Sequence, residues 1–137
     1  MQSQSTSGVN AVGQAASVAA LTGPQEILTE RTANLQRRRD ILFDYLRKAE
    51  GLSCDLPEGA MYIFCNCSGT IGKKTPEGKT IDNDTDFVMY LLDSVGVAVV
   101  QGNAYGREGF FRASFVAPED DLHRGGQKII NACAALS

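Results

Sequence analysis

The sequence has no apolar run approaching the roughly 20 residues that a helix needs to span a bilayer. It also has no excess of basic residues, because 13 Lys and Arg stand against 16 Asp and Glu, giving a net charge of -3. That balance gives no electrostatic reason to expect nucleic-acid binding. The polar start, MQSQSTSG, lacks the charged-then-apolar pattern of a signal peptide. We therefore expect a cytoplasmic protein that binds neither membrane nor nucleic acid.

Metal-ligating residues are few and scattered. Cys54, Cys65, Cys67 and Cys133 contain no CxxC pair, and His123 is the only histidine. Zinc sites normally show tighter clusters of ligands. Strand alternation would place Cys65 and Cys67 on one face, where cysteine usually behaves as a small hydrophobic residue. The sequence thus predicts no metal site.

Two helices are expected in the first 50 residues. Residues 9–21 are rich in Ala and Val and carry no charge, and a helix that is uncharged all round is expected to be buried on more than one side. From Pro24, which suits a first helical turn, an apolar stripe at helical spacing predicts a helix over 24–50 that ends before Gly51. At 1.5 Å per residue this helix is about 40 Å long. It is longer than one small domain needs, so we expect it to bridge two bodies.

The rest of the chain predicts an α+β fold, in which a small, mostly antiparallel sheet packs against the long helix and the C-terminal helix. Three acids in the first turn after Pro118 suit the positive end of the last helix. Asp82, Asp84 and Asp86 imitate the start of a calcium loop, but Phe87 replaces the turning glycine, so we interpret the acids as helix capping. A capping-type Asn or Asp should open the helix over 84–94, which should close before Gly96. The predicted elements are strands over 52–56 (weak), 59–66, 97–100 and 110–115, a polar hairpin or exposed loop over 67–82, and helices over 84–94 and from about Pro118.

One charged side chain interrupts the last predicted strand. Alternation places Phe111, Ala113 and Phe115 on an apolar face and puts Arg112 on the other face, beside a loop rich in Gly and Asn. A guanidinium offers a rigid fork of donors that matches a carboxylate. Arg112 is therefore a candidate anion-binding residue. The alternative is an edge-strand arginine that pairs with an Asp or Glu of the same chain.

Several phrases, in order, cover essentially the whole chain and resemble the C-terminal third of a fold-type-I, pyridoxal-phosphate-dependent aminotransferase of the aspartate aminotransferase branch. The phrase FFRASF around Arg112 is the most telling. The others are QSQSTS at 2–7, PEGAMYIF at 57–64, TDF at 85–87 and GVAVV at 96–100.

The resemblance implies a role for each part of the chain. Arg112 falls on the family's arginine that binds the substrate α-carboxylate, and Thr6 and Ser7 fall on a segment at the dimer interface near the neighbouring active site. It also implies that residues 1–22 end a large domain, that 23–50 form the interdomain helix, and that 51–137 form the small domain of a pyridoxal-phosphate transferase. The parent would be a homodimer.

The resemblance also implies that catalytic parts are missing. None of the lysines (Lys48, Lys73, Lys74, Lys79, Lys128) falls in the family's Schiff-base motif, so we expect a fragment with no catalytic residue of its own that binds pyridoxal 5'-phosphate only in the full-length parent. The parent would exchange an amino group between aspartate, or a similar amino acid, and a 2-oxo acid.

Two other interpretations stay open. The chain could be a free-standing, non-catalytic α+β module that binds a small acid or a protein partner. In that case the uncharged first helix should pack internally, whereas in a fragment it should protrude. The parent could also be an aminotransferase for aromatic or prephenate-like acceptors.

Overall fold

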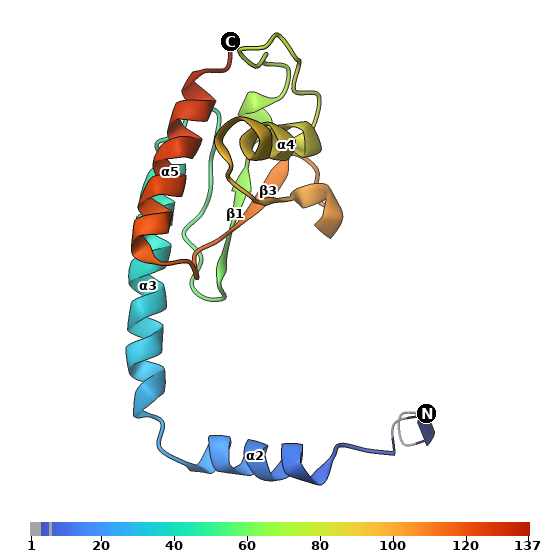
Figure 1. The fold of residues 1–137 in the computed structure, drawn as a ribbon, viewed down its shortest axis with the longest axis vertical. Coiled ribbons are helices and arrows are strands. Elements are labelled where there is room, and N and C mark those ends of the chain that lie inside the picture. Colours follow the sequence, from blue (N-terminus) through green and yellow to red (C-terminus); the bar gives the residue numbers. More distant parts are fainter. Residues whose placement is uncertain (1–3, 6) are drawn as a thin grey trace. The chain divides into compact units, whose positions relative to one another are not determined.

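The computed structural model describes residues 4–5 and 7–137 and divides the chain into two compact units, Met1–Ala33 and Asn34–Ser137. The division falls inside the long helix. No helix among the described residues is long and apolar enough to cross a membrane. The elements in chain order are α2 (Ala11–Thr22), α3 (Glu26–Leu46), β1 (Tyr62–Asn66), η1 (Ser68–Thr70), α4 (Asp84–Val95), β2 (Val100–Gln101), η2 (Gly102–Tyr105), β3 (Phe110–Ser114) and α5 (Glu119–Ala134) (Figure 1).

The first unit contains the uncharged helix α2. Asn10 caps it by accepting a hydrogen bond from the Gly13 amide at 2.7 Å, as an N-cap asparagine does. The helix buries none of its residues, and the side chains of Val12 and Leu21 are 80% and 81% exposed. Within its own unit this apolar helix therefore has an uncovered surface.

The second unit is built on a three-stranded antiparallel sheet in the order β1-β3-β2. β3 is therefore the central strand. In the register, Phe64 and Val100 lie on either side of Arg112, and Cys65 and Gln101 lie on either side of Phe111. The predicted α+β class is confirmed, including the alternation that buries Phe111, Ala113 and Phe115.

Helices α3, α4 and α5 cover the inner face of this sheet (Figure 1). Residues of α3 and α5 were expected there, but α4 packs on the sheet as well: its Phe87 ring lies 5.6 Å from the ring of Phe111. These helices and the sheet share one hydrophobic core. Its fully buried side chains include Leu46, Ile63, Cys65, Ile81, Phe87, Leu91, Phe111, Phe115 and Ile129.

The caps predicted for α4 are confirmed. Asn83 accepts a hydrogen bond from the Asp86 amide at 3.0 Å, and Gly96 ends the helix in the left-handed conformation at φ 67°. The amide of Val97 donates to the Leu91 carbonyl, which completes the cap. Because Val97 is engaged there, the predicted strand over 97–100 begins later, and only Val100 and Gln101 pair with β3.

Two other boundaries differ from the prediction. Helix α3 ends at Leu46 rather than at residue 50, because Lys48 and Ala49 donate to carbonyls three residues back and tighten the chain into turns. The predicted strand over 52–56 is reduced to one bridge, from Ser53 to Asn66. The loop over 67–82 is only partly exposed, because Thr70 and Ile81 are buried.

Helices α3 and α5 approach closely at Gly126 but not at Gly125, so alanine substitutions at these two glycines should have opposite effects on stability. A Cβ at Gly126 would lie 2.4 Å from Cγ of Tyr45, whereas a Cβ at Gly125 would meet nothing within 4 Å. We expect Gly126→Ala to destabilise the protein by about 2 kcal/mol through overpacking. Gly125→Ala should stabilise it by about 0.5–1 kcal/mol through helix propensity. Thermal unfolding of the two variants measures the difference, and equal midpoints would contradict the close approach.

Candidate functional site

Arg112 lies in the middle of the central strand, on the face of the sheet opposite the core. It is half-buried, between Phe64 of β1 and Val100 of β2. This is the placement that the alternation of β3 predicted, except that the strand is not an edge. A central strand holds its side chains more rigidly than an edge strand does, because both of its backbone edges are bonded.

Two tyrosine rings flank the guanidinium of Arg112. Its Cζ lies 4.1 Å from the ring centre of Tyr62 and 4.5 Å from that of Tyr105. Both distances are within the range of a cation–π contact. Rings against the guanidinium faces fix the plane of the group. The N–H donors point from its edge, which stays available to a planar anion.

No carboxylate in the described part of the chain neutralises this arginine. Among the ion pairs of the described residues none involves Arg112, and its buried Nε has no hydrogen-bond acceptor there. A buried donor without an acceptor is unfavourable and calls for an explanation, such as a functional role or a missing ligand. The alternative of an internally paired arginine is therefore not what the structure shows.

Asp84 binds the loop that carries Tyr105 through a hydrogen bond. This carboxylate, 2% exposed, accepts a hydrogen bond from the Asn103 amide at 2.7 Å. The sequence pattern predicts a helix-capping role for Asp84, but Asn83 is the cap and Asp84 instead positions η2. The pair of tyrosines was also missed, because their meeting depends on the contact between a loop and a strand 43 residues earlier in the chain.

The aromatic surface continues beside the arginine. The rings of Phe64 and Phe110 stack at 5.2 Å, Tyr105 meets Phe64 edge-on at 6.4 Å, and Arg107 lies 4.5 Å above Phe110. Apolar walls beside a cation exclude water and strengthen its attraction for an anion. This surface can hold a carboxylate together with a short carbon chain.

The other predicted site residues are Thr6 and Ser7. Thr6 lies outside the described residues. Ser7 is exposed and has a positive φ of 56°, an uncommon conformation for a residue with a side chain. Their role at a dimer interface stays a prediction.

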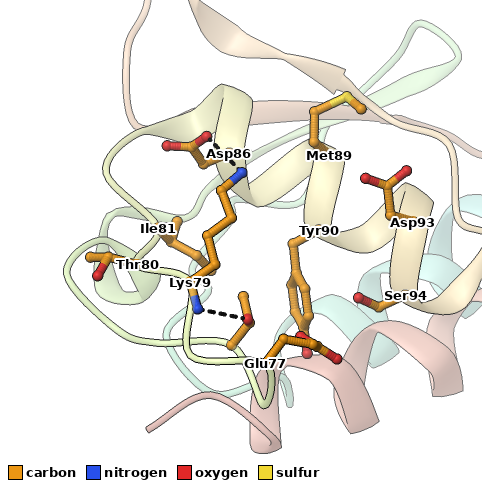
Figure 2. A pocket seen from close by; sticks show the side chains of 10 residues that line it. Glu77, Lys79, Thr80, Ile81, Asp86, Met89, Tyr90, Asp93 and Ser94 are labelled. Atoms are coloured by element: carbon orange, nitrogen blue, oxygen red, sulfur yellow. Dashed lines mark hydrogen bonds and ion pairs between the residues drawn. The ribbon is translucent and has the colours of Figure 1, made fainter.

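A hollow of about 360 Å³ lies between the loop over 75–81 and α4 (Figure 2), and Arg112 is not among the residues that line it. Two of the polar side chains that line it are already engaged with the protein. Lys79 pairs with Asp86 at 3.4 Å, and the hydroxyl of Tyr90 donates to the Ala132 carbonyl at 3.1 Å. The hollow therefore has no counterpart to the free guanidinium donor of Arg112. For this reason we do not place the functional site there.

The lysines of the chain do not fit a Schiff-base role at this face. Lys73 pairs with Glu50 at 2.6 Å, Lys79 pairs with Asp86, and Lys128 donates to the Val95 carbonyl at 2.8 Å. Lys48 is exposed in the turn after α3, and Lys74 is exposed in a β-bridge with Thr80. No lysine faces Arg112 across the aromatic surface in the part of the chain that the structure describes.

The sequence is similar to that of known aminotransferases. It is 50% identical over 137 residues to the aspartate aminotransferase of Rhizobium meliloti (strain 1021), covering all of this chain and 33% of the relative. It is 42% identical over its whole length to an aspartate/prephenate aminotransferase of Cereibacter sphaeroides, of which it covers 34%. The chain thus spans about a third of the length of the curated relatives it matches.

Solved structures agree with these relatives. The crystal structure of the Rhizobium meliloti aspartate aminotransferase matches 99% of this chain with a TM-score of 0.93 and 50% identity, over 34% of its own length. The alanine aminotransferase of Pyrococcus furiosus matches 83% of the chain with a TM-score of 0.72 and 32% identity, over 27% of its own length. The family model for aminotransferases of class I and II matches residues 1–129. The chain therefore belongs to the class I and II aminotransferase family.

Proposed function

We propose that this chain is the C-terminal part of an enzyme that transfers an amino group between aspartate, or a similar amino acid, and a 2-oxo acid. Its contribution is Arg112, which binds the substrate α-carboxylate. The observation that carries the proposal is the guanidinium held between Tyr62 and Tyr105 with no carboxylate partner in the described chain. Substrates of both directions, amino acids and 2-oxo acids, share the α-carboxylate that this fork matches.

Arg112 acts by orientation. Two parallel N–H···O bonds fix a carboxylate in one plane, and a fixed carboxylate sets the direction of the bonds at the neighbouring Cα. The rings of Tyr62 and Tyr105 hold the guanidinium before the substrate arrives, so less freedom is lost on binding. Asp84 supports this arrangement indirectly through the loop that carries Tyr105.

Membership of the family implies pyridoxal phosphate, which when bound supplies the electron sink for chemistry at Cα. This chain offers no lysine suited to attach the cofactor covalently. Its lysines are engaged in ion pairs or hydrogen bonds, or they lie away from Arg112. We therefore place the cofactor in the remaining two-thirds of a parent as long as the relatives.

The proposal includes the organisation of that parent. Residues 1–22 would complete a large domain, 23–50 would form the interdomain helix, and 51–137 would be the small domain. The sequence of α2 supports this division, because it carries no charge and an uncharged helix needs a partner surface. We further propose a cytoplasmic homodimer in which Thr6 and Ser7 approach the active site of the neighbouring subunit.

The relatives are named for aspartate and for aspartate/prephenate, so a dicarboxylic amino acid is the substrate class that we propose. Arg112 would bind the carboxylate that all of these compounds share. Arg112 would not discriminate between the side chains of these compounds, because it binds only the carboxylate. The flanking tyrosines contact the guanidinium of Arg112 itself.

The 137-residue chain should not transaminate by itself. Incubated with pyridoxal phosphate, aspartate and 2-oxoglutarate, it should form no more oxaloacetate than the cofactor does without protein, because no lysine fits the Schiff-base role. The positive control is the parent under the same conditions, which should form oxaloacetate. Oxaloacetate formed by the chain at a rate proportional to its concentration would contradict the proposal.

A further inference from the structure

Two cysteines outside the Arg112 site lie opposite each other in an antiparallel bridge. Ser53 and Asn66 exchange both backbone hydrogen bonds, at 3.0 Å and 2.8 Å, so they form a hydrogen-bonded pair. The pairing ends at this bridge, but one further step in the same register brings Cys54 to the position opposite Cys65, that of a non-hydrogen-bonded pair. The Cα atoms of such pairs are about 4.5 Å apart, which lies within the range of about 4.4–6.8 Å that a disulfide spans.

The environments of the two thiols differ in a way that makes one of them reactive. Cys65 is completely buried, and its Sγ lies 3.6 Å from the Ser53 carbonyl oxygen, on the backbone of the facing segment. Cys54 is only half-buried. A hydrogen bond from the Cys65 thiol lowers the pKa of Cys54, and the same bond together with burial raises the pKa of Cys65. Cys54 is therefore the better thiolate and nucleophile of the pair.

A small oxidant can reach this pair. Cys54 lines an open hollow of about 230 Å³, to which Arg107 brings a positive charge and Asp55 a negative charge. The other two cysteines have no such access, because Cys67 and Cys133 are buried and burial raises the pKa of each to about 12.

We propose that Cys54 and Cys65 are a redox site that peroxides convert to a disulfide. The Cys54 thiolate attacks one oxygen of hydrogen peroxide, so that an S–O bond forms, the O–O bond breaks and, after protonation, water leaves. The Cys65 sulfur then attacks the Cys54 sulfur, the S–O bond breaks, and the thiol proton leaves with the oxygen as a second water. The two sulfurs together lose two electrons, and the peroxide gains them. A thiol reductant reverses the reaction by exchange.

Peroxide treatment of the full chain, followed by mass spectrometry, tests the site. We expect a loss of about 2 Da that dithiothreitol restores, from the two hydrogens released. Proteolytic mapping should join the peptides of Cys54 and Cys65 and leave two of the four thiols free. The disulfide should also raise the unfolding midpoint, by on the order of 10 °C, because it closes a loop in the unfolded chain.

Matched variants separate this pair from the other thiols. Cys54→Ser should abolish the mass loss, whereas Cys133→Ala, which removes a buried thiol on α5, should leave it unchanged. In denaturing guanidinium chloride the selectivity for the pair should disappear, because it depends on the bridge. A native disulfide to Cys67 or Cys133, Cys54 oxidised only to sulfinic acid, or four thiols that stay free would each overturn the proposal.

Discussion

Replacing Arg112 with glutamine in the parent should lower kcat/KM for the amino-acid substrate by roughly 100- to 1,000-fold. The side chain supplies a charge-assisted fork to a carboxylate, and glutamine can offer at most one neutral donor there. Since the carboxylate is bound before and during the reaction, most of the loss should be a higher KM. Arg112→Lys should lose less, because it keeps the charge but not the two parallel bonds. Steady-state kinetics with varied aspartate measures both effects.

Two controls separate a binding role from a structural role of Arg112. Arg47→Gln removes an exposed arginine that pairs with Asp44 three residues away, and it should leave the kinetics unchanged. Added methylguanidine should partly restore activity to Arg112→Ala. The rings of Tyr62 and Tyr105 would still flank the space that the guanidinium left, so the added cation can occupy it. Kinetics of Arg112→Gln equal to those of the unsubstituted enzyme would refute the assignment.

The second large effect is expected at Gly102, where η2 begins. A Cβ there would lie 2.3 Å from the Arg107 carbonyl oxygen and 2.7 Å from that of Phe110. Both neighbours are backbone atoms, so they cannot move aside as the end of a side chain can. We expect Gly102→Ala to destabilise the protein by about 2–4 kcal/mol, which lowers the unfolding midpoint by on the order of 10 °C.

A nearby glycine gives the matched control for Gly102→Ala. Gly106 ends η2 with φ 73°, and a Cβ there would meet nothing within 4 Å. Gly106→Ala should therefore show only the conformational penalty of about 1–2 kcal/mol. Because the Gly102 loop carries Tyr105, Gly102→Ala should also raise KM in the parent. A Gly102→Ala variant with unchanged stability would show that the backbone does not pass so closely at this point.

The elements that sequence reasoning predicted correctly are those whose signals are local. The caps of α4, Asn83 and Gly96, are one example. Each cap needs only a particular side chain or backbone conformation at one position, so it can be recognised in the sequence alone. The alternation around Arg112 likewise needs only neighbouring residues, so the buried face of β3 was predicted before its partners were known. The family resemblance was confirmed for the same kind of reason, since it depends on short phrases in order.

What was missed depends on contacts between distant segments. Tyr62 and Tyr105 meet on Arg112 only because the order β1-β3-β2 brings a strand and a loop to the same side chain. Asp84 has an ordinary capping position in the sequence, and only the approach of Asn103 reveals its other role. The residue pattern over 52–56 resembles a strand, but its pairing stops after Ser53. Composition and periodicity carry no information on any of these contacts.

The most direct test of the central claim is a crystal structure of the parent with a bound amino-acid substrate or 2-oxo acid. The account predicts that both oxygens of the α-carboxylate accept hydrogen bonds from Arg112, with the guanidinium still between Tyr62 and Tyr105. A carboxylate bound by another residue, with Arg112 paired to an Asp or Glu of the large domain, would contradict it. In that case the unpaired arginine of this chain would be a structural contact between domains.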